Sequence, residues 1–235
     1  MDIRTEPLAL CQTILQDYLK VHPAMSGRWQ ERPWAHVYVF THHDPKIRAA
    51  AEALGDLARM QDNQLIDGIP AFLRKLTLLS LDMDKNNTPI VDFHGQHSKF
   101  SNFSPWHVNL HDGAPVAPDF YDYPSVEHAF VAAKCANLAQ RCHIASTPYA
   151  GEVKKYGRTV RLIPDWNEKR LQVMHYLLQQ KFEAYNENAE FLNATGYRVL
   201  VEGNTWRDTT WGICDKRGTN WLGLLLMAIR ADQRH

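Results

Sequence analysis

Residues 123–134 read YPSVEHAFVAAK and combine the start of a helix with a run of apolar residues. Ser125 is a good N-cap, because its hydroxyl can accept a hydrogen bond from an orphan amide in the first turn. The helix is predicted to run to about Leu138. At 3.6 residues per turn, Glu127 and Lys134 lie on one face, about 10 Å apart along the axis. A carboxylate and an amine could therefore bracket one small ligand.

Partial burial of this face would suit Glu127 and Lys134 to chemistry. Desolvation raises the pKa of a carboxyl group and lowers that of an amine, and these are the shifts that a general acid and a nucleophilic amine need. The alternative is that Glu127 is a first-turn acid favoured by the helix dipole and that Lys134 is solvated. Spacing alone leaves both interpretations open.

Around this helix, the second half of the chain mixes short strands with helices. The residues from His111 to Pro124 contain one glycine and three prolines, which break any regular element. Asp165 and Glu168 are spaced as a capping box. The predicted elements are strands at 90–93 and 197–201, a helix from 165 to about 185, a helix end at 191–195 before Gly196, and a buried C-terminal helix at 221–230.

The first half has a different pattern. Turn-forming residues at 82–89 (DMDKNNTP) interrupt two stretches of better periodicity and indicate a boundary. The sequence therefore predicts a helical N-terminal extension over 1–90 and a second domain over 91–235. Apolar residues at helical spacing predict three helices in the extension, at 8–19, 45–60 and 69–81.

Composition narrows the class of protein. Hydrophobic residues make up 45% and charged residues 22% of the chain, which is ordinary globular usage. Lysine plus arginine equals aspartate plus glutamate at 26 each, so no broad positive field is expected to attract long nucleic acids.

Four scattered cysteines without a C-x-x-C pair favour a reducing compartment. The sequence shows no secretory signal and no apolar run long enough for a bilayer, so we expect a soluble intracellular, cytoplasmic protein without a membrane partner. His107 and His111 lack any H-E-x-x-H pattern, and no metal is expected. A nucleophilic pair of a histidine with Cys142 or Cys214 stays open, although neither cysteine lies in a known nucleophile motif.

Two further groups suit a nucleotide-like ligand. Four cations within eight residues around Gly157 suit phosphate, because arginine offers a planar fork and lysine a mobile point charge. The alternative is an exposed helix face. These cations are Lys154, Lys155, Arg158 and Arg161.

Aromatic residues form the other group. Trp166, Trp206 and Trp211 could stack on a base, with Asp208 holding ribose hydroxyls, although tryptophans are commonly core residues. In the loop 100–103, Asn102 beside Phe103 could hold a sugar or an amide, or could only cap a turn.

In their order along the chain, these motifs resemble the NADAR family, which includes the YbiA-like enzymes of the riboflavin pathway. The resemblance spans nearly all of 91–235. It covers FSNFSP (100–105), YPSVEHAFVAAK (123–134), YGRTVRLIPDW (156–166), KF (181–182), TGYRVLVE (195–202), DTTWG (208–212) and GTNWLGLLLMAIR (218–230).

The resemblance implies a fold and a reaction. The fold is α+β and mainly helical, a YbiA-like domain with a few short strands, preceded by the helical extension. The reaction is hydrolysis of an N-glycosidic bond to ribose, without a cofactor. By matching positions, the implied catalytic residues are Glu127, Lys134 and Asp208. The implied substrate-binding residues are Asn102, Phe103, Arg158, Trp166 and Trp211.

The leading hypothesis is removal of ADP-ribose from ADP-ribosylated guanine, so the expected partners are an ADP-ribose-containing substrate and ADP-ribosylated nucleic acid. It rests on the cation group and on the extra N-terminal region. An N-glycosidase acting on phosphorylated riboflavin-pathway intermediates is the second hypothesis. A non-catalytic ADP-ribose or NAD reader is a third, from another class. Three departures from the family pattern bear on the substrate: the 90 leading residues, the longer stretch between His111 and Tyr123, and Phe130-Val-Ala-Ala in the helix.

Overall fold

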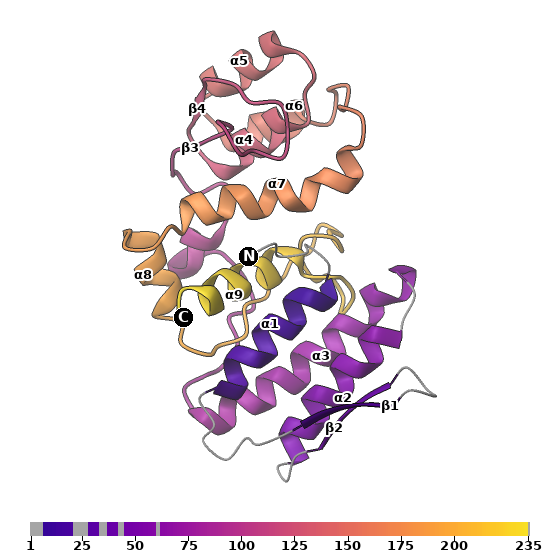
Figure 1. Cartoon of the computed structure of the whole chain (residues 1–235). Helices are drawn as coiled ribbons and strands as arrows, with labels where there is room; N and C mark the ends of the chain where they lie inside the picture. Colours follow the sequence, from indigo (N-terminus) through magenta and orange to yellow (C-terminus); the bar gives the residue numbers. More distant parts are fainter. Residues whose placement is uncertain (1–6, 21–27, 33–36, 42–44, 60–61, 235) are drawn as a thin grey trace. The chain divides into compact units, whose positions relative to one another are not determined.

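The chain forms two compact units. The computed structural model describes residues 7–20, 28–32, 37–41, 45–59 and 62–234. Unit 1 comprises Met1–Phe93 and Asn193–His235, and unit 2 comprises His94–Leu192. The positions of the two units relative to one another are not determined (Figure 1).

Unit 1 is built on four long helices. They are α1 (Pro7–Lys20), α2 (Pro45–Arg59), α3 (Asp62–Met83) and α9 (Trp221–Asp232). Helix α1 packs against α2 and α9, and α2 packs against α3 (Figure 1). The three helices predicted in the first half are confirmed, although Met60, at the predicted end of the second, lies outside the described residues.

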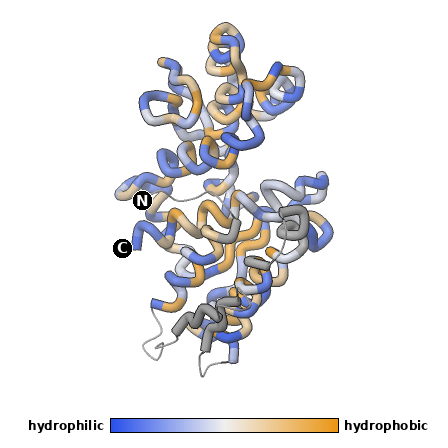
Figure 2. Tube along the Cα trace, turned by 45° about the vertical axis from the view of Figure 1, so that its right-hand side comes forward, coloured by the Kyte–Doolittle hydropathy of each residue, from blue (hydrophilic) through white to orange (hydrophobic). Residues whose placement is uncertain are grey.

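The core of unit 1 follows from apolar spacing. In α1, Leu10, Ile14 and Tyr18 recur every four residues, and each is at most 1% exposed. In α9 every residue from Trp221 to Ala231 is buried, as its all-round hydrophobicity predicts. Figure 2 shows hydrophobic stretches side by side where the helices of this unit meet.

The N-terminal helix is fastened to the C-terminal part of the chain. The Tyr18 hydroxyl donates to the carbonyl of Tyr197. Arg234 Nη1 lies 2.9 Å from a carboxylate oxygen of Asp17, and its guanidinium lies 4.2 Å from the centre of the Tyr197 ring. Part of the predicted extension therefore shares a core with the end of the chain. The domain boundary at 90 and 91 stays a prediction.

Strands are few and short. In unit 1, β1 (Arg28–Arg32) pairs antiparallel with β2 (Val37–Thr41), a hairpin that the sequence analysis missed. The predicted strands at 90–93 and 197–201 are reduced to one parallel bridge, between Ile90 and Leu200. It is held by Ile90 N–H to Val199 O and Val201 N–H to Ile90 O, each 2.8 Å.

Unit 2 surrounds one short helix. Helix α4 (Val126–Ala133) packs against three others: α5 (Leu138–Ser146), α6 (Ala150–Tyr156) and α7 (Trp166–Lys181) (Figure 1). The remaining elements are the 3₁₀ helix η1 (Gly95–Phe100), the strands β3 (Val108–Asn109) and β4 (Asp122–Tyr123), which pair antiparallel, and α8 (Glu187–Asn193), whose last residue belongs to unit 1.

The helix predicted from Ser125 to about Leu138 ends five residues early, and a separate helix, α5, begins at Leu138. Helix α4 ends at Ala133, and Lys134 O accepts from Ile163 N–H at 2.9 Å, which draws the chain away. A second start follows, because the Asn137 side chain accepts from Ala139 N–H at 2.8 Å and caps α5.

Helix α7 also differs in detail from its prediction. It ends at Lys181, four residues before the predicted end. Asp165 occupies the N-cap with φ 59° and makes no side-chain capping bond, so the predicted capping box does not form. The broad prediction of a mainly helical α+β fold is confirmed. Within the described ranges, no helix combines the length and apolar character needed to cross a membrane.

Candidate active site

Glu127 lies in the first turn of α4, where the loop before the helix holds it. Its side chain is 8% exposed, and its backbone N–H donates to Asn102 O at 3.0 Å. Asn102 is held in turn, because its side-chain amide lies 3.6 Å from the Met174 sulfur of α7. The loop therefore fixes the position of Glu127 along the helix axis.

The next residue, His128, locks the same turn. The Ser125 hydroxyl does not cap an amide as predicted but lies 2.7 Å from His128 Nδ1. His128 Nε2 lies 3.0 Å from Thr147 O, which can only accept, so Nε2 carries the proton and Nδ1 accepts from the hydroxyl. Burial lowers the pKa of His128, while the bond to Thr147 acts in the opposite direction. A neutral imidazole thus ties α4 to the end of α5.

Lys134 forms the C-cap of α4 and is half-buried. Its amine lies against Gly157, since a Cβ at that position would be 2.9 Å from Lys134 Nζ and 2.8 Å from Val131 Cγ1. Burial lowers the pKa of Lys134, and the negative charge of Glu127 partly opposes this shift. The predicted lowering of the amine pKa is confirmed in direction.

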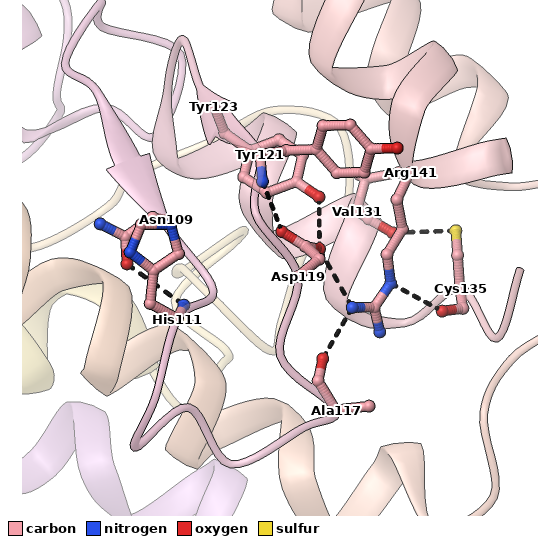
Figure 3. Close-up of polar contacts among 9 residues, drawn as sticks. All are labelled: Asn109, His111, Ala117, Asp119, Tyr121, Tyr123, Val131, Cys135 and Arg141. Atoms are coloured by element: carbon pink, nitrogen blue, oxygen red, sulfur yellow. Dashed lines mark hydrogen bonds and ion pairs between the residues drawn. The ribbon is translucent and has the colours of Figure 1, made fainter. Parts of the chain in front are cut away.

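A buried ion pair supports both ends of α4 (Figure 3). Arg141 Nη1 donates to Asp119 Oδ2 at 3.0 Å and to Ala117 O at 2.7 Å, both in the irregular stretch before the helix. Its Nε donates to Cys135 O at 3.1 Å, just after the helix. The Tyr123 hydroxyl donates to Asp119 Oδ2 at 2.7 Å, and burial raises the pKa of this phenol. The proline-rich stretch is therefore anchored to the helix that it precedes.

Aromatic rings and cations lie beside α4. The Trp166 ring, at the start of α7, lies 5.1 Å from the Phe130 ring, and Trp166 is 8% exposed. Phe103 is 41% exposed, with Lys154 Nζ 5.3 Å from its ring centre. Arg158 is exposed and directly follows Gly157, the residue that meets Lys134. This arrangement suits an anionic ligand near the amine.

The remaining two predicted residues lie in unit 1. Asp208 Oδ1 accepts from the N–H groups of Thr210 at 3.0 Å and Trp211 at 2.8 Å, which shapes a tight turn. Asn204 bonds both to the N–H and to the carbonyl of Asp208. In this loop a Cβ on Gly212 would come within 2.1 Å of Glu202 O, so only glycine fits there.

Six of the eight predicted site residues thus gather around α4 in unit 2, and Asp208 and Trp211 share a loop of unit 1. Their roles stay predictions. In the portion of the chain that the structure describes, no three histidine, cysteine, aspartate or glutamate residues come together as a metal site.

Sequence reasoning included Lys181 in the matching stretch KF (181–182) but gave it no role, and the structure shows it fully buried. Its Nζ donates to Ser101 O at 2.7 Å, beside Asn102. Burial lowers its pKa to about 7, and the nearby charge of Lys99 acts in the same direction. Its place in that stretch was the available signal.

Comparison with known proteins supplies the remaining observation. The family model for the NADAR domain matches residues 92–234. The chain belongs to the NADAR family. The expected relationship is confirmed.

Named relatives of this NADAR protein cover the same region. It is 33% identical over 137 residues to an N-glycosidase of Nostoc punctiforme, covering 58% of this chain and 85% of the relative. It is 33% identical over 147 residues to the N-glycosidase YbiA of Escherichia coli, covering 60% and 86%. It is 30% identical over 148 residues to the chloroplastic riboflavin biosynthesis protein PYRR of Zea mays, covering 57% of this chain and 23% of that protein.

The solved structures agree with the fold. The NMR structure of E. coli YbiA matches with a TM-score of 0.53 and 31% identity, over 63% of this chain and 86% of that one. A YbiA-like fold is therefore confirmed for this NADAR protein. The relatives also support an N-glycosidase, as the sequence predicted.

Proposed function

We propose that this NADAR protein removes ADP-ribose from ADP-ribosylated guanine by hydrolysing the bond between ribose C1′ and nitrogen. One observation carries the choice of substrate: the contact between Lys134 and Gly157 brings the cation group next to the site on α4. A diphosphate linkage offers two anionic groups to such cations, whereas a riboflavin-pathway intermediate offers one phosphate.

The residues of unit 2 support a general-acid step. Breaking the C1′–N bond builds positive charge on the ribose, and the departing nitrogen needs a proton. Glu127 donates that proton, water adds its oxygen to C1′, and the proton released by water returns to the carboxylate.

Lys134 provides a covalent variant of the reaction. Its neutral amine attacks C1′, the base nitrogen leaves with a proton, and ring opening gives a Schiff base that water hydrolyses. The lowered pKa of Lys134 supports this variant, because more of the amine is neutral near pH 7. Borohydride treatment during turnover should then leave a reduced sugar adduct on Lys134. Unmodified Lys134 under conditions of full turnover would exclude the covalent variant.

The substrate is tested by offering two compounds separately. We expect mass spectrometry to detect free ADP-ribose and intact guanine after incubation with an ADP-ribosylated guanine oligonucleotide. The phosphorylated ribosylamino-pyrimidine should stay unchanged. The reverse result would favour the riboflavin-pathway reaction, which the name of the maize relative supports.

A non-catalytic ADP-ribose reader is the alternative from another class. A reader would need the rings and the cations but no proton donor. Release of no product from either compound, with ADP-ribose bound normally, would favour the reader.

A further inference from the structure

Helix α7 lies along α4 with a register fixed by two contacts in unit 2. Near its start, the Trp166 ring packs 5.1 Å from the Phe130 ring. Two turns later, Met174 Sδ accepts from the side-chain amide of Asn102 at 3.6 Å. These contacts define the face of α7 that meets α4 and the loop before it.

Arg170 lies midway between these contacts. It is four residues from Trp166 and four from Met174, so the three side chains form one row on the helix. In α4, Glu127 lies one turn before Phe130, and the N–H of Glu127 donates to Asn102 O. The row therefore places Arg170 between the level of Phe130 and that of Asn102, whose carbonyl holds the Glu127 N–H.

Arg170 differs from the buried arginines Arg141 and Arg230 in the hydrogen bonds of its side chain. Arg141 is held by Ala117, Asp119 and Cys135. Arg230 has an unpartnered Nε, but its Nη1 donates to Thr195 Oγ1 at 2.6 Å and to Arg198 O at 2.9 Å.

The Nε of Arg170 is buried and has no hydrogen-bond partner among the described residues. Most buried polar groups have a partner, so this Nε–H is a donor left for a ligand.

Asn102 supplies a complementary group. Its Oδ1 is buried and has no hydrogen-bond partner among the described residues, while its Nδ2 is directed to Met174. Arg170 thus presents an unmet donor, and Asn102, which contacts Met174 one turn further along α7, presents an unmet acceptor. One hydroxyl group satisfies both, because it accepts and donates at the same time. A phosphate would meet the arginine but be repelled by the amide oxygen.

We propose that Arg170 and Asn102 together bind a ribose hydroxyl next to Glu127, which makes Arg170 a substrate-binding residue. The identity of the ligand rests on the proposed function, because a glycosidase that protonates the departing nitrogen must hold the sugar beside its acid. Both candidate substrates share a ribose 5-phosphate unit. The proposal therefore concerns the sugar and applies to either leaving group.

The test measures binding of sugar phosphates that have no glycosidic bond. Ribose 5-phosphate, 2-deoxyribose 5-phosphate and 3-deoxyribose 5-phosphate are titrated into the full chain by saturation-transfer NMR. Wild-type protein should prefer ribose 5-phosphate over at least one deoxy sugar by about tenfold, as expected for a hydroxyl bound by a charged donor. In Arg170→Met and Asn102→Ala, this preference should fall close to one.

Matched variants separate this effect from folding. Arg74→Met removes an exposed arginine of α3 and should keep the full preference. If Arg170→Met does not fold, Arg170→Lys keeps the charge without the Nε–H and should lose the preference too. A preference that persists in the variants, or wild-type protein that binds no sugar phosphate or ignores both hydroxyls, would overturn the proposal. Because the probes cannot react, a failure to hydrolyse either substrate leaves this test unaffected.

Discussion

Helices α4 and α9 are both almost entirely buried, but their charged side chains have different surroundings. The arginine of α9, Arg230, donates to Thr195 and Arg198 within its own unit. Lys134, at the end of α4, instead lies against a glycine with its pKa lowered by burial. We infer that the charge on α9 supports the fold, whereas the groups at the two ends of α4 serve the reaction.

The largest expected effect concerns the acid of α4. Glu127→Gln should lower kcat about 10²- to 10⁴-fold, because the amide cannot donate a proton to the departing nitrogen. Binding of ADP-ribose and the urea midpoint should change little. Full turnover by this variant would show that α4 resembles α9 in having only a structural task.

Substitution of Arg230, the arginine of α9, should lower stability rather than catalytic activity. Arg230→Met removes the buried hydrogen bonds to Thr195 Oγ1 and Arg198 O and should cost about 2–4 kcal/mol of unfolding free energy. Urea unfolding followed by circular dichroism measures the loss. Per folded molecule, kcat at low temperature should match that of wild-type protein, and a selective loss of kcat would contradict the comparison.

A smaller effect is expected at the glycine that faces Lys134. Gly157→Ala places a Cβ 2.8 Å from Val131 Cγ1 and 2.9 Å from Lys134 Nζ, so the amine must move. We expect roughly tenfold lower kcat and about 1–3 kcal/mol lower stability, as for an overpacked site. Gly151→Ala is the control, since its Cβ would meet nothing within 4 Å. Equal activity of the two variants would remove the argument for a positioned amine.

The last effect is a change in the pH dependence of stability. The pKa of Lys181 is about 7 in the folded protein and 10.5 ordinarily, so between these values the unfolded chain binds a proton that the folded chain does not. Stability from Lys181 is therefore complete above pH 10.5 and lost as the pH falls toward 7. Lys181→Met should remove up to roughly 1 kcal/mol per pH unit from the rise in stability over this range. Parallel urea titrations of variant and wild-type protein across this range would argue against the lowered pKa.

Local pattern predicted the helices well where burial decides them. The all-round apolar sequence 221–230 is enough to identify α9, and apolar spacing identifies the helices of the first half. Pattern was less informative where several local partners compete. The hydroxyl of Ser125 bonds to His128 instead of an amide, and the carbonyl of Lys134 is taken by Ile163, which lies far along the chain.

The candidate site was predictable in part. The spacing of Glu127 and Lys134 follows from one helix, and the sequence supplied both residues. The burial and contacts of Lys181 and Arg170 could not be predicted, because they depend on the register of α7 against α4 and the loop at Ser101. The hairpin of β1 and β2 was missed although Val37–Thr41 is rich in residues that favour strands.

The contact between α1 and α9 has a consequence for biosynthesis. The partners of Tyr18 and Asp17 are Tyr197 and Arg234, so about 180 to 220 residues separate the two sides of these contacts. All of unit 2 emerges from the ribosome in between, as one continuous stretch that can fold first. The part of α1 that packs against α9 must then wait for the last helix, and chaperones that shield apolar surfaces are expected to bind the nascent chain during this interval.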